Sequence, residues 1–110
     1  MTVLVVDDRH PGQIELDGVV VPLQDKQYRL MQLLAATPGE CVDYERIYEH
    51  LWGDAIVENN QIHFQRRRLV ERIKAMVPAR ENVVRTVPKR GFVLDLHPGE
   101  VAMHRRPSAA

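Results

Sequence analysis

The sequence has a single cysteine, Cys41, among its 110 residues. A disulfide needs two cysteines and a cysteine metal site needs several, so neither is available. Long apolar runs are also lacking, because none approaches the roughly 20 residues that cross a bilayer. Residues 3–6 are too short for the core of a signal peptide and are followed by Asp7 and Asp8. We therefore expect a cytoplasmic protein without a membrane partner.

Catalytic and metal-binding patterns are lacking as well. The five histidines show no metal-ligand spacing. Neither a glycine-rich phosphate loop nor a Ser/His/Asp or Cys/His set can be assembled from the chain. We therefore expect no enzyme, no cofactor and no metal site.

Charge is present in quantity but is divided along the chain. The formal net charge is zero, yet residues 1–58 hold 4 Lys/Arg against 11 Asp/Glu, and residues 59–110 hold 11 against 4. Such asymmetry indicates an anionic partner for the basic half. A membrane surface fits poorly, because the basic segment lacks the broad apolar face with aromatic anchors of interfacial helices. Nucleic acid is the better candidate.

The first half of the chain predicts a small sheet followed by two helices. Residues 3–6, 13–16 and 19–21 read as short antiparallel strands, and Asp17-Gly18 is a strong hairpin signal. Apolar residues at helical spacing predict helices over 25–36 and 44–52. Pro38 and Gly39 end the first helix, and Asp43 is suited to cap the second. At 110 residues, this is the size of one domain.

The second half predicts a basic helix and a basic hairpin. Over residues 58–76, Ile62, Leu69 and Ile73 share a face that would turn to the core, while a run of three arginines lies between them. Residues 83–87 and 92–96 read as two strands joined by a basic tip, 88–91. Residues 97–110 have no periodicity, so we expect a domain over 1–96 and a disordered tail over 97–110.

This order of elements predicts an α+β winged helix-turn-helix, with an N-terminal antiparallel sheet, three helices and a C-terminal β-hairpin wing. An α-helix fits the major groove of DNA, where arginine bonds guanine and amides bond adenine. The wing would reach phosphates or the minor groove with Arg85, Lys89 and Arg90. His63, near the same helix face, is a further candidate contact. The alternative is that Arg66 to Arg68 form an ordinary solvated helix face.

Several motifs, taken in order, resemble the OmpR/PhoB-type winged-helix effector domain of response regulators. They are Leu23-Gln24 with Gln27-Tyr28 and Leu33-Leu34, Pro38-Gly39-Glu40, Glu45-Arg46, Leu51-Trp52-Gly53, Arg68-Leu69 and the TVPKRGF run from Thr86 to Phe92. The last is similar to the TVPGRGY-like form of ToxR/CadC-like proteins. The resemblance covers about residues 3–96. Members usually carry a receiver or sensory domain as well. The 110 residues hold neither, so we expect a free-standing DNA-binding domain here.

The resemblance implies a role for particular residues. In the recognition helix, the major-groove positions match Gln65, Arg67 and Arg68, with Gln61 near the helix entrance. In the wing, the phosphate and minor-groove positions match Thr86 and Arg90, with Lys89 beside them. The loop over residues 53–59 matches the segment with which members touch RNA polymerase, and it contains Asp54 and Glu58.

Two departures from the family pattern concern helix starts and register. The family's N-cap threonine before the first helix is replaced by Gln24, so we expect Asp25 to cap instead. Arg66 stands where an apolar residue is usual. Either its side chain extends from the apolar stripe toward solvent or the helix register shifts by one position. We keep Arg66 among the candidate DNA contacts.

The function expected from the sequence is sequence-specific binding of double-stranded DNA and regulation of transcription, by a monomer or a weak dimer on tandem sites. The alternative is a protein-interaction module that docks on RNA polymerase or on another regulator. Steep salt dependence of binding would distinguish the two.

Overall fold

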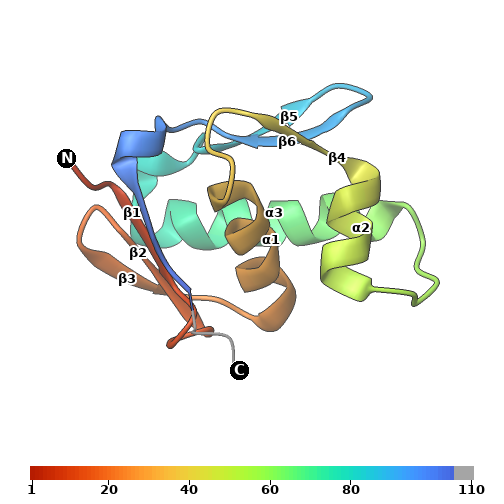
Figure 1. The fold of residues 1–110 in the computed structure, drawn as a ribbon, viewed down its shortest axis with the longest axis horizontal. Helices are drawn as coiled ribbons and strands as arrows, with labels where there is room; N and C mark the ends of the chain where they lie inside the picture. Colours follow the sequence, from red (N-terminus) through yellow and green to blue (C-terminus); the bar gives the residue numbers. More distant parts are fainter. Residues whose placement is uncertain (106–110) are drawn as a thin grey trace.

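The computed structural model describes residues 1–105 and has an α+β architecture (Figure 1). In Figure 1 one sheet lies to the left of the three helices and the other runs along the top of the molecule. In chain order, the described elements are β1 (Leu4–Asp7), β2 (Gln13–Leu16), β3 (Val19–Pro22), α1 (Asp25–Ala35), β4 (Cys41–Asp43), α2 (Tyr44–Trp52), α3 (Asn60–Met76), the 3-10 turn η1 (Pro78–Arg80), β5 (Val84–Val87), β6 (Gly91–Leu94), the 3-10 turn η2 (Pro98–Glu100) and β7 (Val101–His104). No helix in this part of the chain is long and apolar enough to span a membrane.

The N-terminal sheet has the strand order β3-β2-β1-β7. β1, β2 and β3 pair antiparallel, as expected from their alternating pattern. Asp17 and Gly18 between β2 and β3 have φ angles of 50° and 79°. Positive φ at both central residues is the type I′ hairpin turn that the Asp-Gly pair predicted.

The fourth strand of this sheet corrects the expected disordered tail over 97–110. β7 pairs parallel with β1 along its whole length, from Leu4 opposite Val101 to Asp7 opposite His104. Val101 and Met103 pack against the core, and this burial supplies the driving force that the short segment lacks by itself. The domain therefore extends to residue 104, and the part of the predicted tail over 106–110 lies outside the described residues.

The helices share one core with both sheets. On α3, Ile62, Leu69 and Ile73 are at most 1% exposed, which confirms the face predicted from their spacing. On α1, Leu30, Met31 and Leu34 are fully buried, and on α2 Ile47 and Leu51 are. Phe92 of β6 is the largest fully buried side chain. α3 thus keeps the predicted register, and its remaining sides are left to other contacts.

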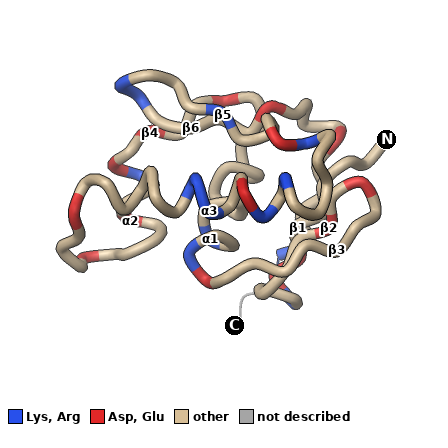
Figure 2. The backbone as a smooth tube through the Cα atoms, turned by 180° about the vertical axis from the view of Figure 1, so that it is seen from behind, with Lys and Arg blue, Asp and Glu red and all other residues tan. Residues whose placement is uncertain are grey.

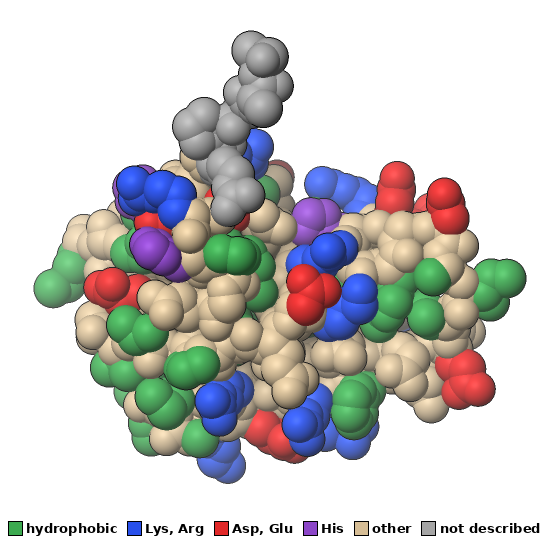
Figure 3. Space-filling model, turned by 90° about the horizontal axis from the view of Figure 1, so that it is seen from below, with side chains coloured by type: hydrophobic (Ala, Val, Ile, Leu, Met, Phe, Trp, Pro, Cys, Tyr) green, Lys and Arg blue, Asp and Glu red, His purple; other side chains and the backbone are tan. Residues whose placement is uncertain are grey.

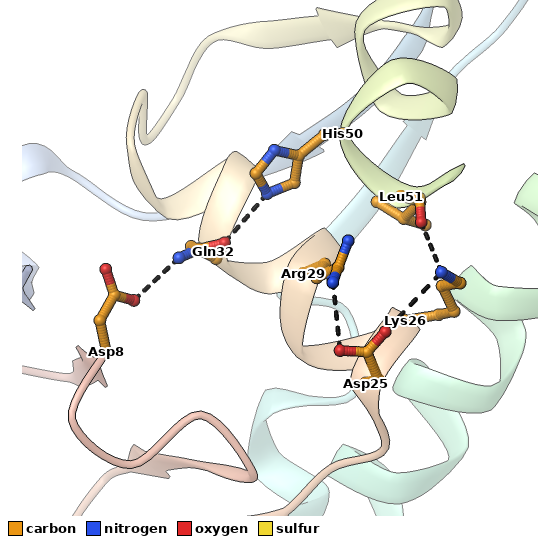
Figure 4. Close-up of polar contacts among 7 residues, drawn as sticks. All are labelled: Asp8, Asp25, Lys26, Arg29, Gln32, His50 and Leu51. Atoms are coloured by element: carbon orange, nitrogen blue, oxygen red, sulfur yellow. Dashed lines mark hydrogen bonds and ion pairs between the residues drawn. The ribbon is translucent and has the colours of Figure 1, made fainter. Parts of the chain in front are cut away.

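Polar contacts hold α1 against α2 and against the end of β1 (Figure 4). The Lys26 Nζ on α1 donates to the Leu51 carbonyl at 2.6 Å, which satisfies an otherwise free carbonyl in the last turn of α2. Gln32 Nε2 donates to Asp8 Oδ1 at 2.8 Å, and Gln32 Oε1 accepts from His50 Nε2 at 3.0 Å. These contacts fix the angle between the first two helices.

The helix starts differ in part from the expectations. The Asp43 side chain accepts from the backbone N–H of Arg46 at 2.9 Å, so its predicted N-cap of α2 is confirmed. The N-cap of α1 is Gln24 rather than Asp25, because the Gln27 side chain reaches back to the Gln24 N–H at 3.1 Å. α3 begins at Asn60 rather than at residue 58, and the Asn59 side chain does not cap it.

The second sheet carries the wing and has the order β4-β6-β5. β4 lies between α1 and α2 in the chain and was not predicted. It pairs antiparallel with β6. A Cβ at Gly91 would lie 1.8 Å from the Val42 carbonyl oxygen. Only glycine permits this approach, so Gly91, the first residue of β6 after the hairpin turn, lets β4 pair with β6 and fasten the hairpin to the helices.

Candidate nucleic-acid interface

The outward side of α3 and the tip of the β5–β6 hairpin carry the basic residues. Figure 2, which views the molecule from behind, shows Lys and Arg recurring along α3 and again at the hairpin tip. α3 covers the back of the molecule and α1 the front (Figure 1). The residues of the basic half thus form one surface from two elements.

Arg67 and Arg68 are the most accessible part of the predicted arginine run. Both side chains are exposed, and no ion pair among residues 1–105 uses either one. At about 100° per residue, both point away from the buried stripe of Ile62, Leu69 and Ile73. Two guanidinium groups are therefore available to an external anion or base edge.

Arg66 behaves differently from its two neighbours. Its Nη2 donates to the Val84 carbonyl of β5 at 3.0 Å, and its guanidinium lies 5.7 Å from the centre of the Phe92 ring. The Nε is buried and has no hydrogen-bond partner among the described residues. Burial lowers the pKa of this guanidinium below its usual value. Such a side chain holds the hairpin against α3, and this placement does not fit the direct DNA contact expected of it.

Gln61 and Gln65 are half-buried on the side of α3 that continues from Arg68. His63, by contrast, is directed toward the hairpin base, where its ring lies 5.5 Å from Tyr44 and 5.7 Å from Phe92. The His63 side chain remains exposed. Its aromatic neighbours fix the orientation of the first turn of α3 relative to β6.

The wing tip presents a lysine and an arginine from a tight turn. The Arg90 N–H donates to the Val87 carbonyl at 3.0 Å, and Lys89 has a φ of 62°. Both basic side chains are exposed, as is that of Thr86. Arg85 lies nearer the base and is ion-paired with Asp95 at 3.4 Å. Lys89 and Arg90 therefore carry the free positive charge of the wing.

A groove separates α3 from β5. Its volume is about 510 Å³, and its lining includes Arg66, Asn82, Arg85 and Thr86. All four of these side chains can donate hydrogen bonds and two are cationic, and Asp95 adds an acidic group to the same lining. Both cations of the groove already have partners within the fold, the Val84 carbonyl for Arg66 and Asp95 for Arg85.

The loop between α2 and α3 has a different chemistry. Asp54 and Glu58 are exposed, and between them Ile56 is fully exposed at 101%. The Tyr48 hydroxyl donates to the Glu58 carbonyl at 3.2 Å and so ties the end of the loop to α2. Acidic and hydrophobic side chains lie side by side at this end of the molecule (Figure 3).

Phe64 is one residue of the interface that the sequence analysis did not select. It lies on the outward side of α3, and 43% of its surface is exposed. The Arg68 guanidinium lies 5.8 Å from the centre of its ring. The signal in the sequence was its position one turn before Arg68 and out of phase with Ile62 and Leu69.

No group of three or more acidic, histidine or cysteine side chains able to hold a metal ion occurs among residues 1–105.

Comparison with known proteins gives consistent results. A family model described as "Transcriptional regulatory protein, C terminal" matches residues 18–94. The response regulator ArlR of Staphylococcus aureus is 27% identical over 88 residues, which are 79% of this chain and 39% of ArlR. The chain thus spans about two-fifths of the length of that relative.

Two solved structures have the same fold. The DNA-binding domain of E. coli CadC superposes with a TM-score of 0.71 at 23% identity, over 88% of this chain and 94% of that domain. The DNA-binding domain of Klebsiella pneumoniae RstA, solved in complex with the RstA box, superposes with a TM-score of 0.64 at 20% identity, over 77% of this chain and 84% of that one.

Proposed function

Because this chain belongs to the family of transcriptional regulatory protein C-terminal domains, we propose that it binds double-stranded DNA sequence-specifically and regulates transcription. The family is the one that its sequence motifs resembled. The observation that carries the proposal is the exposure of Arg67 and Arg68 on α3, a helix whose basic residues are seen from the same side of the molecule as the basic tip of the wing (Figure 2). The proposed activity is binding rather than catalysis. The proposed location is the cytoplasm, where the partner DNA would lie.

α3 is the proposed recognition helix. In the major groove, Arg67 and Arg68 would bond the O6 and N7 of guanine, and Gln61 and Gln65 would bond the N6 and N7 of adenine. Because the four side chains lie along less than two turns of helix, they would read neighbouring base pairs. Arg66 is not among the proposed contacts, since its guanidinium is hydrogen-bonded to Val84.

The wing is the proposed backbone contact. Lys89 and Arg90 extend from the tip and would neutralise phosphates or enter the adjacent minor groove. Thr86 would donate to a phosphate oxygen along the groove beside β5. Arg85 is a weaker candidate, because Asp95 already balances its charge. Contacts of this kind position the protein without reading sequence.

The loop between α2 and α3 is the proposed contact for RNA polymerase. Asp54 and Glu58 suit a basic partner surface, and the fully exposed Ile56 supplies an apolar centre. This feature also favours the second candidate function, docking on polymerase or on another regulator without DNA contact. On DNA, a monomer or a weak dimer on tandem sites is the proposed assembly.

Selection of duplexes from a random-sequence pool at low salt tests the proposal. The purified protein should retain a defined sequence, and the selected site should reveal its symmetry and any half-site spacing. Arg68→Ala should weaken binding by about 1–3 kcal/mol at one or two positions of that site. Arg29→Ala, which removes a cation of α1 that is ion-paired with Asp25, is the matched control and should leave binding unchanged. Failure to retain any duplex would contradict the proposal and favour the protein-docking alternative.

A further inference from the structure

The polar side of α3 is interrupted by one large aromatic side chain, Phe64. The core of α3 is complete without it, because Ile62, Leu69 and Ile73 are already at most 1% exposed. Phe64 lies about 200° around the helix from Ile62, which directs its ring outward. Leaving 43% of a phenylalanine in water forgoes hydrophobic stabilisation. The exposed part of the ring is therefore available to contact a partner.

Arg68 holds the exposed ring in place. The two residues are separated by one helical turn, and the Arg68 guanidinium carbon lies 5.8 Å from the centre of the Phe64 ring. At this distance the cation is attracted by the face of the ring. The Phe64 ring and the hydrogen-bond donors of the Arg68 guanidinium therefore lie side by side on the outward side of α3.

The surroundings of Phe64 do not form an apolar docking patch. Its polar-face neighbours within one turn are Arg67, Arg68 and Asn60, all exposed. The next exposed apolar side chain of α3, Met76, is 12 residues away, which is about 18 Å along the helix. An isolated apolar ring among cationic and amide groups suits a surface that is mostly polar and anionic but carries a single apolar group.

The major groove of DNA offers one such group, the C5-methyl of thymine. We propose that Phe64 contacts the C5-methyl of a thymine immediately next to the base pair that Arg68 reads, and so specifies a thymine beside a guanine. This inference rests on the proposed function, in which α3 enters the major groove. Apolar contact with a thymine methyl discriminates T·A from G·C and C·G, which carry no methyl group, and from A·T, whose methyl group lies on the opposite strand.

The test removes single methyl groups from the DNA. Once a site has been selected, each thymine is replaced in turn by deoxyuridine, which lacks only the C5-methyl group, and the dissociation constant is measured. For the wild-type protein, one replacement next to the Arg68-dependent base pair should weaken binding roughly fourfold, the effect of losing one buried methyl group. Phe64→Ala should bind the thymine and deoxyuridine duplexes equally.

Matched controls separate contact from folding. Met76→Ala removes the other exposed apolar side chain of α3 and should keep the full sensitivity to deoxyuridine. Because half of the Phe64 ring is already in water, Phe64→Ala should unfold at nearly the wild-type temperature. As a second control, cytosines elsewhere in the site, away from the thymine that Phe64 contacts, are replaced by 5-methylcytosine. This replacement should have no effect on binding by either protein.

Different results would refute the role of Phe64 and the proposed DNA binding. Equal binding of all deoxyuridine duplexes by the wild-type protein, or an undiminished sensitivity in Phe64→Ala, would overturn the role of Phe64 while leaving sequence-specific binding intact. A selected site without thymine beside the Arg68-dependent pair would overturn it as well. Retention of no duplex at all would instead refute the proposed function itself.

Discussion

Lys89 stands at the tip of the wing with a φ of 62°, a conformation that glycine adopts freely and lysine does not. Lys89→Gly should therefore raise the free energy of unfolding by about 1 kcal/mol. The same change should weaken binding of all DNA sequences evenly and lower the slope of log affinity against log salt by about 1. Chemical denaturation and binding titrations at several salt concentrations measure the two effects. A loss of affinity confined to particular sequences would contradict a phosphate contact.

Arg66 is a second residue whose role follows from its surroundings rather than from its charge. Arg66→Met keeps an unbranched side chain beside Phe92 but loses the hydrogen bond to the Val84 carbonyl. We expect a fall of about 1 kcal/mol in the free energy of unfolding and faster hydrogen exchange in β5. Affinity for DNA should fall while the selected sequence stays the same. A changed base preference would show instead that Arg66 touches a base.

At the scale of elements, β7 closes the N-terminal sheet. The Val3 N–H donates to the Glu100 carbonyl at 2.7 Å and the Asp8 N–H to the His104 carbonyl at 2.8 Å. Ending the chain at His97 should lower the free energy of unfolding by roughly 2 kcal/mol, mainly through loss of the half-buried Val101 and Met103. The full-length chain is the control. Equal stability of the truncated and full-length chains would show that β7 adds nothing to the fold.

The contact between α1 and α2 should depend on pH through His50. Burial, and then the nearby Arg29, lower the pKa of His50 below its ordinary value of 6.5, while Asp8 opposes them. The contribution of neutral His50 to stability is therefore fully present above pH 6.5 and is lost as the pH falls toward the lower pKa of the folded state. Between pH 7 and 5, the melting temperature of the wild-type protein should fall more than that of His50→Gln. His10→Gln, at an exposed turn position, should follow the wild-type profile.

At the scale of the whole molecule, the fold converts a division along the chain into a division in space. The basic half, with 11 Lys/Arg against 4 Asp/Glu, supplies α3 and the wing (Figure 2), while the acidic half supplies β1, β2 and β3 of the first sheet, α1 and α2. Binding of DNA should weaken linearly with log salt, with a slope of about −0.9 per phosphate neutralised. Arg90→Ala should reduce this slope by about 1, whereas Glu15→Gln in the first sheet should not change it.

The parts of the fold that were predictable are those with local causes. Asp17-Gly18 specifies its turn through backbone conformation, Asp43 caps α2 through its own side chain, and the spacing of Ile62, Leu69 and Ile73 identifies the buried face of α3. Each of these signals lies within a few residues of the structure that it produces. Arg67 and Arg68 followed from the same periodicity, because residues out of phase with a buried stripe face outward.

The features that were not predictable depend on contacts between residues far apart in the chain. β4 and β7 are strands because β6 and β1 offer them edges to pair with, and neither short segment carries an alternating pattern strong enough to predict it. The position of Arg66 depends on the Val84 carbonyl, 18 residues away along the chain. The exposure of Phe64 depends on a core that other side chains already fill. Local patterns along the chain are enough to specify the basic helix and the wing, whereas packing between elements sets which of their side chains remain exposed.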